Sequence, residues 1–197
     1  MVSINEWKEK TPLGRAEWIK LYGEFFNQRA QADSIFLRIK TDYLEAKKLV
    51  LSQKHKPSVM LGANYKGTWY MPGGLSYMAT LLKDAGASYF YADDTHTGSV
   101  SLTFENVLHD FNQTDVWLNA PVASLSALLA LDERHNLFKP TQDHNVFGLY
   151  KKVNAQGAND FWESGVTRPD LVLKDFIWAL YPKTMTDYTP TYIIHLQ

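Results

Sequence analysis

Hydrophobic runs alternate with polar loops from Pro57 to Glu105, and this alternation predicts two successive strand–loop–helix units. Residues 59–62 are apolar and indicate a buried strand, and residues 89–91 indicate a second strand. Units of this kind build a parallel sheet, in which the loops after the strands lie at one edge. Because ligands bind open α/β sheets at that edge, we expect a binding surface there.

The loops of these two units carry side chains that suit binding. Residues 64–74 contain aromatic side chains and glycines, and residues 93–99 are polar. Between the loops, apolar residues at helical spacing predict a helix that begins near Ser76 and ends before Gly86.

Two further strands are predicted, at residues 116–118 and 146–150, with residues 192–196 as a candidate edge strand. Helices are expected at residues 124–131 and from Arg168 to a stop at Pro182. The sequence therefore predicts a three-layer α/β/α fold, class α/β, with a central parallel sheet of about four strands.

Two helices precede the first strand. Thr11 and Pro12 are typical of a helix start, and this helix is expected to end near Asn27. A second helix is predicted from Gln31 to Leu51, with one apolar and one charged face. Its length would be roughly 30 Å, enough to span a domain or to connect two.

Composition narrows the class of protein. The chain has 197 residues, a formal net charge of −1 and no cysteine, which excludes disulfides and thiolate metal sites. The charge gives no reason to expect a nucleic acid partner. No apolar run reaches the length of a membrane span, and residues 1–10 are polar, so neither a span nor an export signal is predicted within the chain.

Short stretches in a fixed order resemble one family, the class III periplasmic binding proteins, which are the solute-binding subunits of ABC importers for iron-siderophores, haem and cobalamin. The stretches are Pro12–Trp18, Trp69–Tyr77, Asp84–Gly86, Ser101–Glu105, Asp115–Trp117, Trp162–Glu163 and Arg168–Leu173.

The resemblance implies two α/β lobes joined by one long helix, with the ligand bound between the lobes. It covers only the joining part, residues 1–55, and the C-terminal lobe, residues 56–197, so the N-terminal lobe is missing. It implies a metal-chelate ligand, an ABC permease as partner, and no cofactor or enzymatic activity. It also implies a periplasmic protein or a membrane-anchored lipoprotein, whose export signal would precede the missing lobe.

Trp69 and Tyr70 are candidate ligand-binding residues because an indole and a phenol can stack on a flat macrocycle. The alternative is that both rings pack on the protein's own surface. Gly73, Gly74 and Ser76 precede a helix, whose free N–H groups could hold an anion; Ser76 also fits a simple N-cap.

Asp93, Asp94 and His96 raise the question of a metal site, but no second His accompanies them at ligand spacing, and Asp favours turns for local reasons. We therefore predict no metal site and expect His96 and Thr97 to contact the ligand. A different class of function is a small α/β hydrolase that uses Asp93, Asp94 and His96. No nucleophile, base and orienting group can be assembled from the spacing, which disfavours it.

Three more residues complete the candidate set. Trp162 and Arg168 lie in the last long loop, where Arg168 could bind a carboxylate or pair with Glu163. Glu105 lies in the first turn of its helix, where a carboxylate interacts favourably with the helix dipole. The family resemblance implies a sharper role for Glu105, docking against arginines of the permease.

Overall fold

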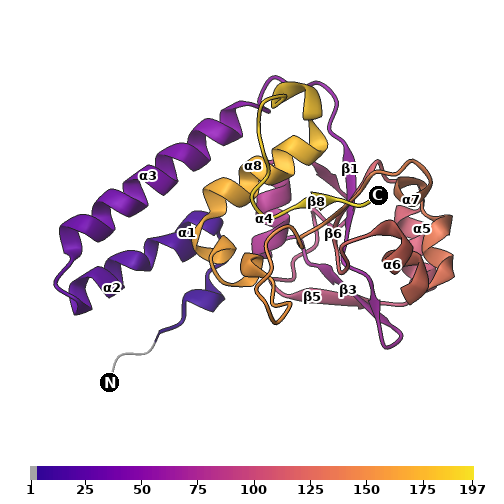
Figure 1. The fold of residues 1–197 in the computed structure, drawn as a ribbon, viewed down its shortest axis with the longest axis horizontal. Coiled ribbons are helices and arrows are strands. Elements are labelled where there is room, and N and C mark those ends of the chain that lie inside the picture. Colours follow the sequence, from indigo (N-terminus) through magenta and orange to yellow (C-terminus); the bar gives the residue numbers. More distant parts are fainter. Residues whose placement is uncertain (1–3) are drawn as a thin grey trace.

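The computed structural model describes residues 4–197, which form three layers with a sheet in the middle (Figure 1). The α-helices are α1 (Pro12–Glu17), α2 (Ile19–Phe25), α3 (Arg29–Lys48), α4 (Tyr77–Asp84), α5 (Phe104–Phe111), α6 (Leu125–Leu131), α7 (Lys139–Gln142) and α8 (Pro169–Leu180). The strands are β1 (Ser58–Leu61), β2 (Asn64–Tyr65), β3 (Thr68–Pro72), β4 (Ser88–Tyr89), β5 (Ser99–Leu102), β6 (Val116–Ala120), β7 (Val146–Gly148) and β8 (Ile194–His195). Short 3-10 turns are η1 (Glu6–Lys8), η2 (Glu133–Leu137), η3 (Asp160–Trp162), η4 (Gly165–Thr167) and η5 (Pro182–Thr184).

The central sheet has the strand order β4-β1-β6-β7-β8. The first four strands are parallel, and β8 runs antiparallel to β7 at the edge. The predicted α/β class with a central parallel sheet of about four strands is confirmed, and the C-terminal tail forms the expected edge strand.

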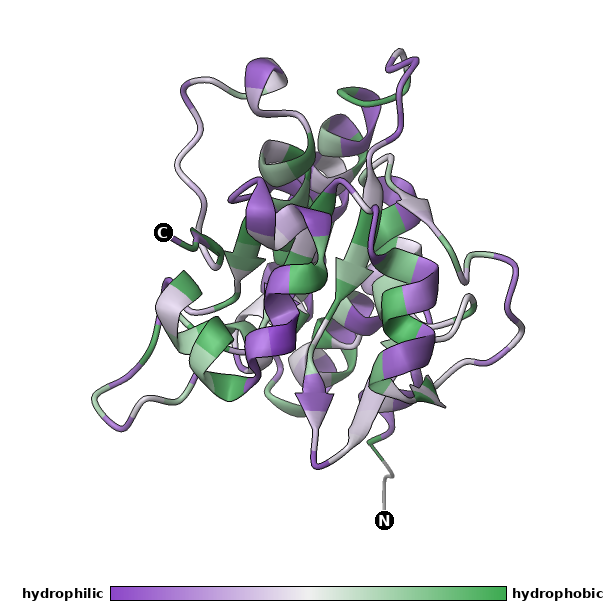
Figure 2. Cartoon of the chain, turned by 90° about the vertical axis from the view of Figure 1, so that its right-hand side faces the viewer, coloured by the Kyte–Doolittle hydropathy of each residue, from purple (hydrophilic) through white to green (hydrophobic). Residues whose placement is uncertain are grey.

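Helices cover both faces of this sheet. In Figure 1, α4 and α8 lie on one side of it, and α5, α6 and α7 lie on the other. Figure 2 shows that the sheet strands are mostly hydrophobic, whereas the helices carry both hydrophobic and hydrophilic positions. This is the pattern of a sheet buried on both faces by amphipathic helices.

The long helix α3 runs unbroken, as predicted, and it takes part in two separate hydrophobic clusters. Tyr43 and Ala46 in its C-terminal half belong to the main core, whereas Phe36 and Ile39 pack with Ala16 of α1. The helix thus begins outside the α/β core and ends inside it. Figure 1 shows α2 and α3 side by side, extending away from the sheet.

Two polar contacts fasten the end of α3 to α4. The Tyr43 hydroxyl donates to Asp84 at 2.7 Å, and Lys47 Nζ lies 2.5 Å from the other oxygen of the same carboxylate. The carboxylate side chain is mostly buried, so both contacts act in a medium of low dielectric constant. Burial and this hydrogen bond raise the pKa of Tyr43 far above its usual value.

The expected continuous helix from Pro12 to Asn27 is interrupted at Trp18, so that prediction is wrong in this detail. Trp18 forms the junction of α1 and α2, and its indole donates to Glu9 at 3.0 Å. The start and end are as expected, since the Thr11 side chain caps α1 and Asn27 has a φ of +53°. Asn tolerates this left-handed conformation, which ends the helix.

A second, antiparallel sheet has the order β2-β3-β5, and its strands β2 and β3 lie in residues 64–74, which were expected to be a loop. Lys66 and Gly67 both have positive φ, as a two-residue hairpin turn requires, and Asn64 accepts a hydrogen bond from the Gly67 N–H. The strand β3 then pairs with β5, from Trp69 opposite Leu102 to Pro72 opposite Ser99. The loops after β1 and β4 are therefore joined in one small sheet.

Asp175 fixes the C-terminal tail to α8. Its fully buried carboxylate accepts hydrogen bonds from the Tyr188 hydroxyl and from the backbone N–H groups of Thr191, Tyr192 and Ile193, at 2.6–3.2 Å. Burial raises the pKa of Asp175, and these donors oppose that effect. The tail can reach β7 and pair as β8 because this carboxylate replaces the missing backbone partners.

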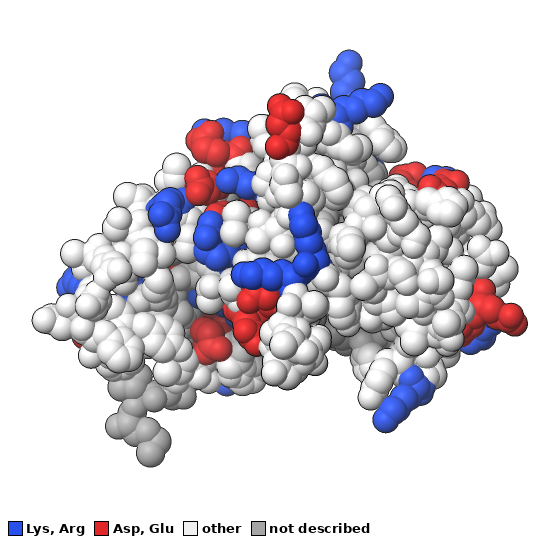
Figure 3. All heavy atoms as spheres, in the orientation of Figure 1, with Lys and Arg blue, Asp and Glu red and all other residues white. Residues whose placement is uncertain are grey.

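Charges of both signs are interspersed on the face shown in Figure 3 rather than gathered by sign. Within residues 4–197, the helices are either too short or too polar to cross a lipid bilayer.

We expect Asp175→Ala to lower the free energy of unfolding by about 3 kcal/mol, because it leaves buried N–H groups without an acceptor. Urea unfolding followed by circular dichroism measures this loss. The control is Asp187→Ala, an exposed position of the same tail, which should change stability by less than about 0.5 kcal/mol. Equal effects of the two substitutions would contradict the role given to Asp175.

Candidate functional site

The chain leaves the central sheet through a sharp turn at the end of β1. Gly62 has a φ of +68°, a left-handed conformation that glycine adopts without steric cost. The Trp69 indole N–H donates to the Leu61 carbonyl at 2.7 Å, and the Trp117 indole N–H donates to the Gly62 carbonyl at 2.8 Å. Two tryptophans therefore hold consecutive carbonyls at the exit of the strand.

Both indoles belong to a compact group of rings beneath the carboxyl edge, which we call the aromatic cluster. It consists of Trp69, Phe104, Trp117, His135 and Phe138, with ring centroids 5.3–6.1 Å apart. His135 donates Nδ1–H to the Leu128 carbonyl at 2.9 Å, and burial lowers its pKa. His135 is thus a neutral core residue, which its isolated place in the sequence did not reveal.

The strand β3 alternates between the core and the outside. Trp69 is 0% exposed and Met71 is also buried, whereas Tyr70 between them is 52% exposed. The expected placement of Trp69 on a ligand-contacting surface is therefore wrong, because pairing with β5 turns its indole inward. The alternating pattern was the available signal, but the neighbouring glycines and proline suggested a loop. Tyr70 keeps the exposed position predicted for it.

The loop after β4 holds His96 in a defined orientation. Asp94 accepts hydrogen bonds from the His96 backbone N–H at 2.9 Å and from its Nδ1 at 2.9 Å. The His96 hydrogen bonds lower the pKa of Asp94. This leaves the Nε2 edge of the ring directed away from the carboxylate, and both His96 and Thr97 are exposed, as expected of ligand contacts.

Gly73 and Gly74 serve to bring two loops together rather than to hold an anion. The Gly73 N–H donates to the Gly98 carbonyl at 2.8 Å, and the Leu75 N–H donates to the His96 carbonyl at 3.0 Å. A Cβ on Gly74 would lie 2.4 Å from the Asp94 carbonyl oxygen, so only glycine fits this approach. The expected free N–H groups are already bonded, and Ser76 is the N-cap of α4.

Trp162 projects from the long connection between β7 and α8. Its side chain is 62% exposed, and its ring meets the buried Phe161 edge to face. Asp160 supports this turn, because it pairs with Lys152 at 2.8 Å and accepts a hydrogen bond from the Ser164 hydroxyl. These contacts lower the pKa of Asp160. Trp162 is therefore an exposed ring on an anchored turn.

Arg168 forms an ion pair within the protein. Its guanidinium donates to both oxygens of Asp170, at 2.9 and 2.7 Å, and Asp170 is fully buried. The pair with Glu163 that the sequence suggested is wrong, because the buried carboxylate two residues away takes both donors. Arg168 has three further N–H groups, and it lines a small cavity of about 340 Å³ beside Arg15 and Val166.

Glu105 is exposed in the first turn of α5, where its own backbone N–H and Thr103 lower the pKa of the carboxyl group. Its side chain is 75% exposed, and Arg134 lies 3.5 Å away. Arg134 donates to Asp132 at 2.7–3.2 Å and stacks over Phe104 at 4.1 Å. Glu105 therefore has a partner within the protein, although the Arg134 guanidinium is held mainly by Asp132.

The structure brings Tyr70, His96 and Thr97 onto one continuous ladder, since the β3–β5 pairing extends through Gly73 and Gly98. Trp162 and Arg168 come from a separate loop at the same carboxyl side of the chain's parallel strands. Within residues 4–197, no group of three or more His, Asp or Glu side chains could hold a metal ion.

The model of a family described as periplasmic binding protein matches residues 1–127. An uncharacterized lipoprotein of Methanocaldococcus jannaschii is 27% identical over 186 residues, which cover 92% of this chain and 42% of that protein. The chain thus spans less than half the length of this relative.

Solved structures show the same fold. A periplasmic solute-binding protein of Veillonella parvula matches with a TM-score of 0.68 at 18% identity, over 91% of this chain and 53% of that one. The periplasmic heme-binding protein RhuT of Roseiflexus matches with a TM-score of 0.67 at 16% identity, over 89% of this chain and 65% of that one. Both structures extend beyond the part that this chain covers.

We expect Trp69→Phe to lower the free energy of unfolding by roughly 1–2 kcal/mol, because the ring volume is largely kept while the Leu61 carbonyl loses its donor. Chemical unfolding monitored by circular dichroism measures the change. Tyr70→Phe is the matched control on the outer face of the same strand and should stay within about 0.5 kcal/mol. If Trp69→Phe left the free energy of unfolding unchanged, the indole hydrogen bond would not contribute to stability.

Proposed function

Since the chain belongs to the periplasmic binding protein family, we propose that it forms the joining helix and the C-terminal ligand-binding lobe of a solute-binding protein that delivers a metal chelate to an ABC importer. In this proposal residues 1–55 are the joining part and residues 56–197 the lobe. The observation that carries it is that Tyr70, His96 and Thr97 are all exposed on the segments that follow the carboxyl ends of the parallel strands β1 and β4.

The proposed ligand is an iron-siderophore, haem or cobalamin. Tyr70 and Trp162 are exposed rings whose faces suit a flat or greasy macrocycle and whose polar tips suit hydrogen bonds at its periphery. His96, Thr97 and the remaining donors of Arg168 add polar contacts. One structural relative is named a heme-binding protein, which supports this ligand class without choosing among the three.

A binding role is favoured over catalysis. The alternative hydrolase would use Asp93, Asp94 and His96, but Asp94 and His96 are bonded to each other within one exposed loop. Among the described residues, no hydroxyl group is hydrogen-bonded to His96, so the set lacks an activated nucleophile. The proteins of this family are binding components, which agrees with the same conclusion.

We further propose that a second α/β lobe packs against the hairpin of α2 and α3. This hairpin extends away from the sheet, and Phe25, Phe26 and Leu37 are exposed on it. A hollow of about 390 Å³ beside Tyr22 and Phe26 has a mostly apolar lining. Exposed apolar surface of this kind marks an interaction site, and the relatives are longer than this chain.

The family implies an extracytoplasmic location, and the curated relative is named a lipoprotein. We therefore propose a periplasmic protein or a membrane-anchored extracytoplasmic lipoprotein, with the permease of an ABC importer as its partner.

Glu105 is the residue that we propose to dock against an arginine of the permease. The backbone N–H at the helix N-terminus and Thr103 lower the pKa of its carboxyl group, which favours the charged form. Asp132 holds the guanidinium of Arg134, so Arg134 neutralises Glu105 only in part. A charged pair at such an exposed position mainly steers association and fixes its register.

The ligand proposal is tested by titrating residues 1–197 with hemin, a ferric siderophore and cobalamin while following tryptophan fluorescence. We expect binding of one of them at about micromolar affinity or weaker, since one lobe covers only part of the ligand. Trp162→Ala and Tyr70→Ala should each weaken it by roughly tenfold. Phe26→Ala, which removes an exposed ring at the end of α2 on the hairpin that extends away from the sheet, is the control and should have no effect. Nanomolar binding by this chain alone, or equal loss in the control, would contradict the proposed site.

The docking role is tested with Glu105→Gln in the form of the protein that carries both lobes. Ligand affinity should stay within about twofold, because an exposed substitution costs little. Transport into vesicles that contain the permease should fall, and more steeply at low salt, where charges are least screened. Glu133→Gln, an exposed carboxylate in the nearby turn η2, is the control. Normal transport by Glu105→Gln would refute the docking role.

A further inference from the structure

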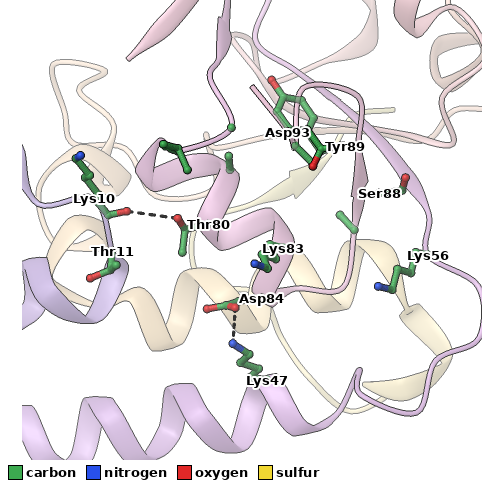
Figure 4. Close-up of a pocket in the computed structure, with 15 residues that line it drawn as sticks. Lys10, Thr11, Lys47, Lys56, Thr80, Lys83, Asp84, Ser88, Tyr89 and Asp93 are labelled. Atoms are coloured by element: carbon green, nitrogen blue, oxygen red, sulfur yellow. Dashed lines mark hydrogen bonds and ion pairs between the residues drawn. The ribbon is translucent and has the colours of Figure 1, made fainter. Parts of the chain in front are cut away.

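A pocket of about 750 Å³ lies beside the edge strand β4, apart from the side chains of the proposed ligand surface. Its walls come from the start of α1, the end of α3, the helix α4 and β4 with the turn after it (Figure 4). Its lining includes none of the exposed side chains proposed to contact the chelate, which are Tyr70, His96, Thr97 and Trp162. Its volume falls in the usual range of small-molecule sites.

Four lysines from four different segments line this pocket, Lys10, Lys47, Lys56 and Lys83. Figure 4 shows Lys10 and Lys56 on opposite sides, with Lys83 on the helix between them. The four lysines outnumber the two aspartates in the lining, although the whole chain has a net charge of −1. The lining of the pocket is therefore more positively charged than the chain as a whole.

Among the described residues, Lys47 is the one lysine of the four that forms an ion pair. Asp84 is occupied by Lys47 on one oxygen and by the Tyr43 hydroxyl on the other. Within residues 4–197, the amino groups of Lys10, Lys56 and Lys83 form neither an ion pair nor a hydrogen bond. Like charges gathered in a hollow repel one another unless an anion joins them, and a hollow concentrates their field on such an anion.

The kind of cation indicates the kind of anion. The pocket contains lysines and no arginine, so it lacks the planar fork that binds carboxylates in a bidentate manner. Lysines act as point charges that can surround a tetrahedral group from several sides. Alanines at positions 79, 87 and 92 and the exposed Ser88 leave room and add a hydroxyl.

We propose that this lysine pocket binds a multiply charged, phosphate-bearing anion. The inference is separate from the proposed metal-chelate site, since none of the side chains proposed for that site lines this pocket. The phosphate could belong to a soluble molecule or to a lipid headgroup, and the experiment distinguishes these two sources.

Calorimetric titration of residues 1–197 with inorganic pyrophosphate tests the proposal. The double variant Lys56→Gln and Lys83→Gln should bind about tenfold more weakly, because two unpaired charges are removed. Asp93→Asn should bind about twofold more tightly, because a like-charged group leaves the rim. The matched control, Lys40→Gln with Lys66→Gln, removes two exposed lysines outside the pocket and should bind as the unaltered chain does.

Sedimentation with vesicles identifies the source of the phosphate. Binding to phosphatidylglycerol vesicles, absent with phosphatidylcholine and lost in the double pocket variant, supports a lipid headgroup. Pyrophosphate binding without vesicle binding supports a soluble anion. If neither probe binds, or if the control variant weakens binding as much as the pocket variant does, the proposal is wrong. Thermal unfolding of each variant verifies its fold, and since no chelate is used, failure here leaves the proposed transport function untouched.

Discussion

The structure of the carboxyl edge depends on two indole N–H groups that bind the carbonyls of Leu61 and Gly62. Trp117 belongs to the central sheet and Trp69 to the small antiparallel sheet, so these bonds join both sheets to the exit of β1. A buried carbonyl that loses its donor costs on the order of 1–3 kcal/mol, which makes the junction costly to open. The orientation of the outer face of β3, including Tyr70, follows from this junction.

The same construction determines how the edge can recognise a ligand. The N–H groups of Gly73 and Leu75 donate to the carbonyls of Gly98 and His96, and the Ser76 N–H donates to the Gly73 carbonyl. In the proposed function, contacts to the ligand would therefore come mainly from exposed side chains. Here those side chains are a phenol, an imidazole and an indole, which favour a large ring with polar edges over a small bare anion. The lysine pocket beside β4 has the opposite character, so the two surfaces suit different chemistry.

The elements that local sequence determines were predictable. Thr11, Ser76, Thr103 and Ser124 each cap the helix that follows, and Gly86 ends α4 at a φ of +79°. The parallel strands followed from apolar runs between such signals, and of the site residues Tyr70, His96, Thr97 and Trp162 are exposed as the sequence suggested.

The side-chain positions that depend on residues far away in the sequence could not be predicted. Trp69 turns inward because β3 pairs with β5, about thirty residues later in the chain, and local pattern does not reveal that pairing. Arg168 chooses Asp170 over Glu163 because the helix start buries Asp170 completely, and burial is a property of the packed chain. The aromatic cluster and the lysine pocket likewise gather residues from several segments.

The helix α3 is held by distant contacts at both ends. Its end is fixed to α4 through Asp84, while its beginning packs with α1 in a separate cluster. An unbroken helix held in this way transmits the position of whatever packs on the α2–α3 hairpin to the lobe with little bending. In the proposed two-lobed protein the spacing across the ligand site would therefore be set by α3, and affinity would depend on a gap that exists before the ligand arrives.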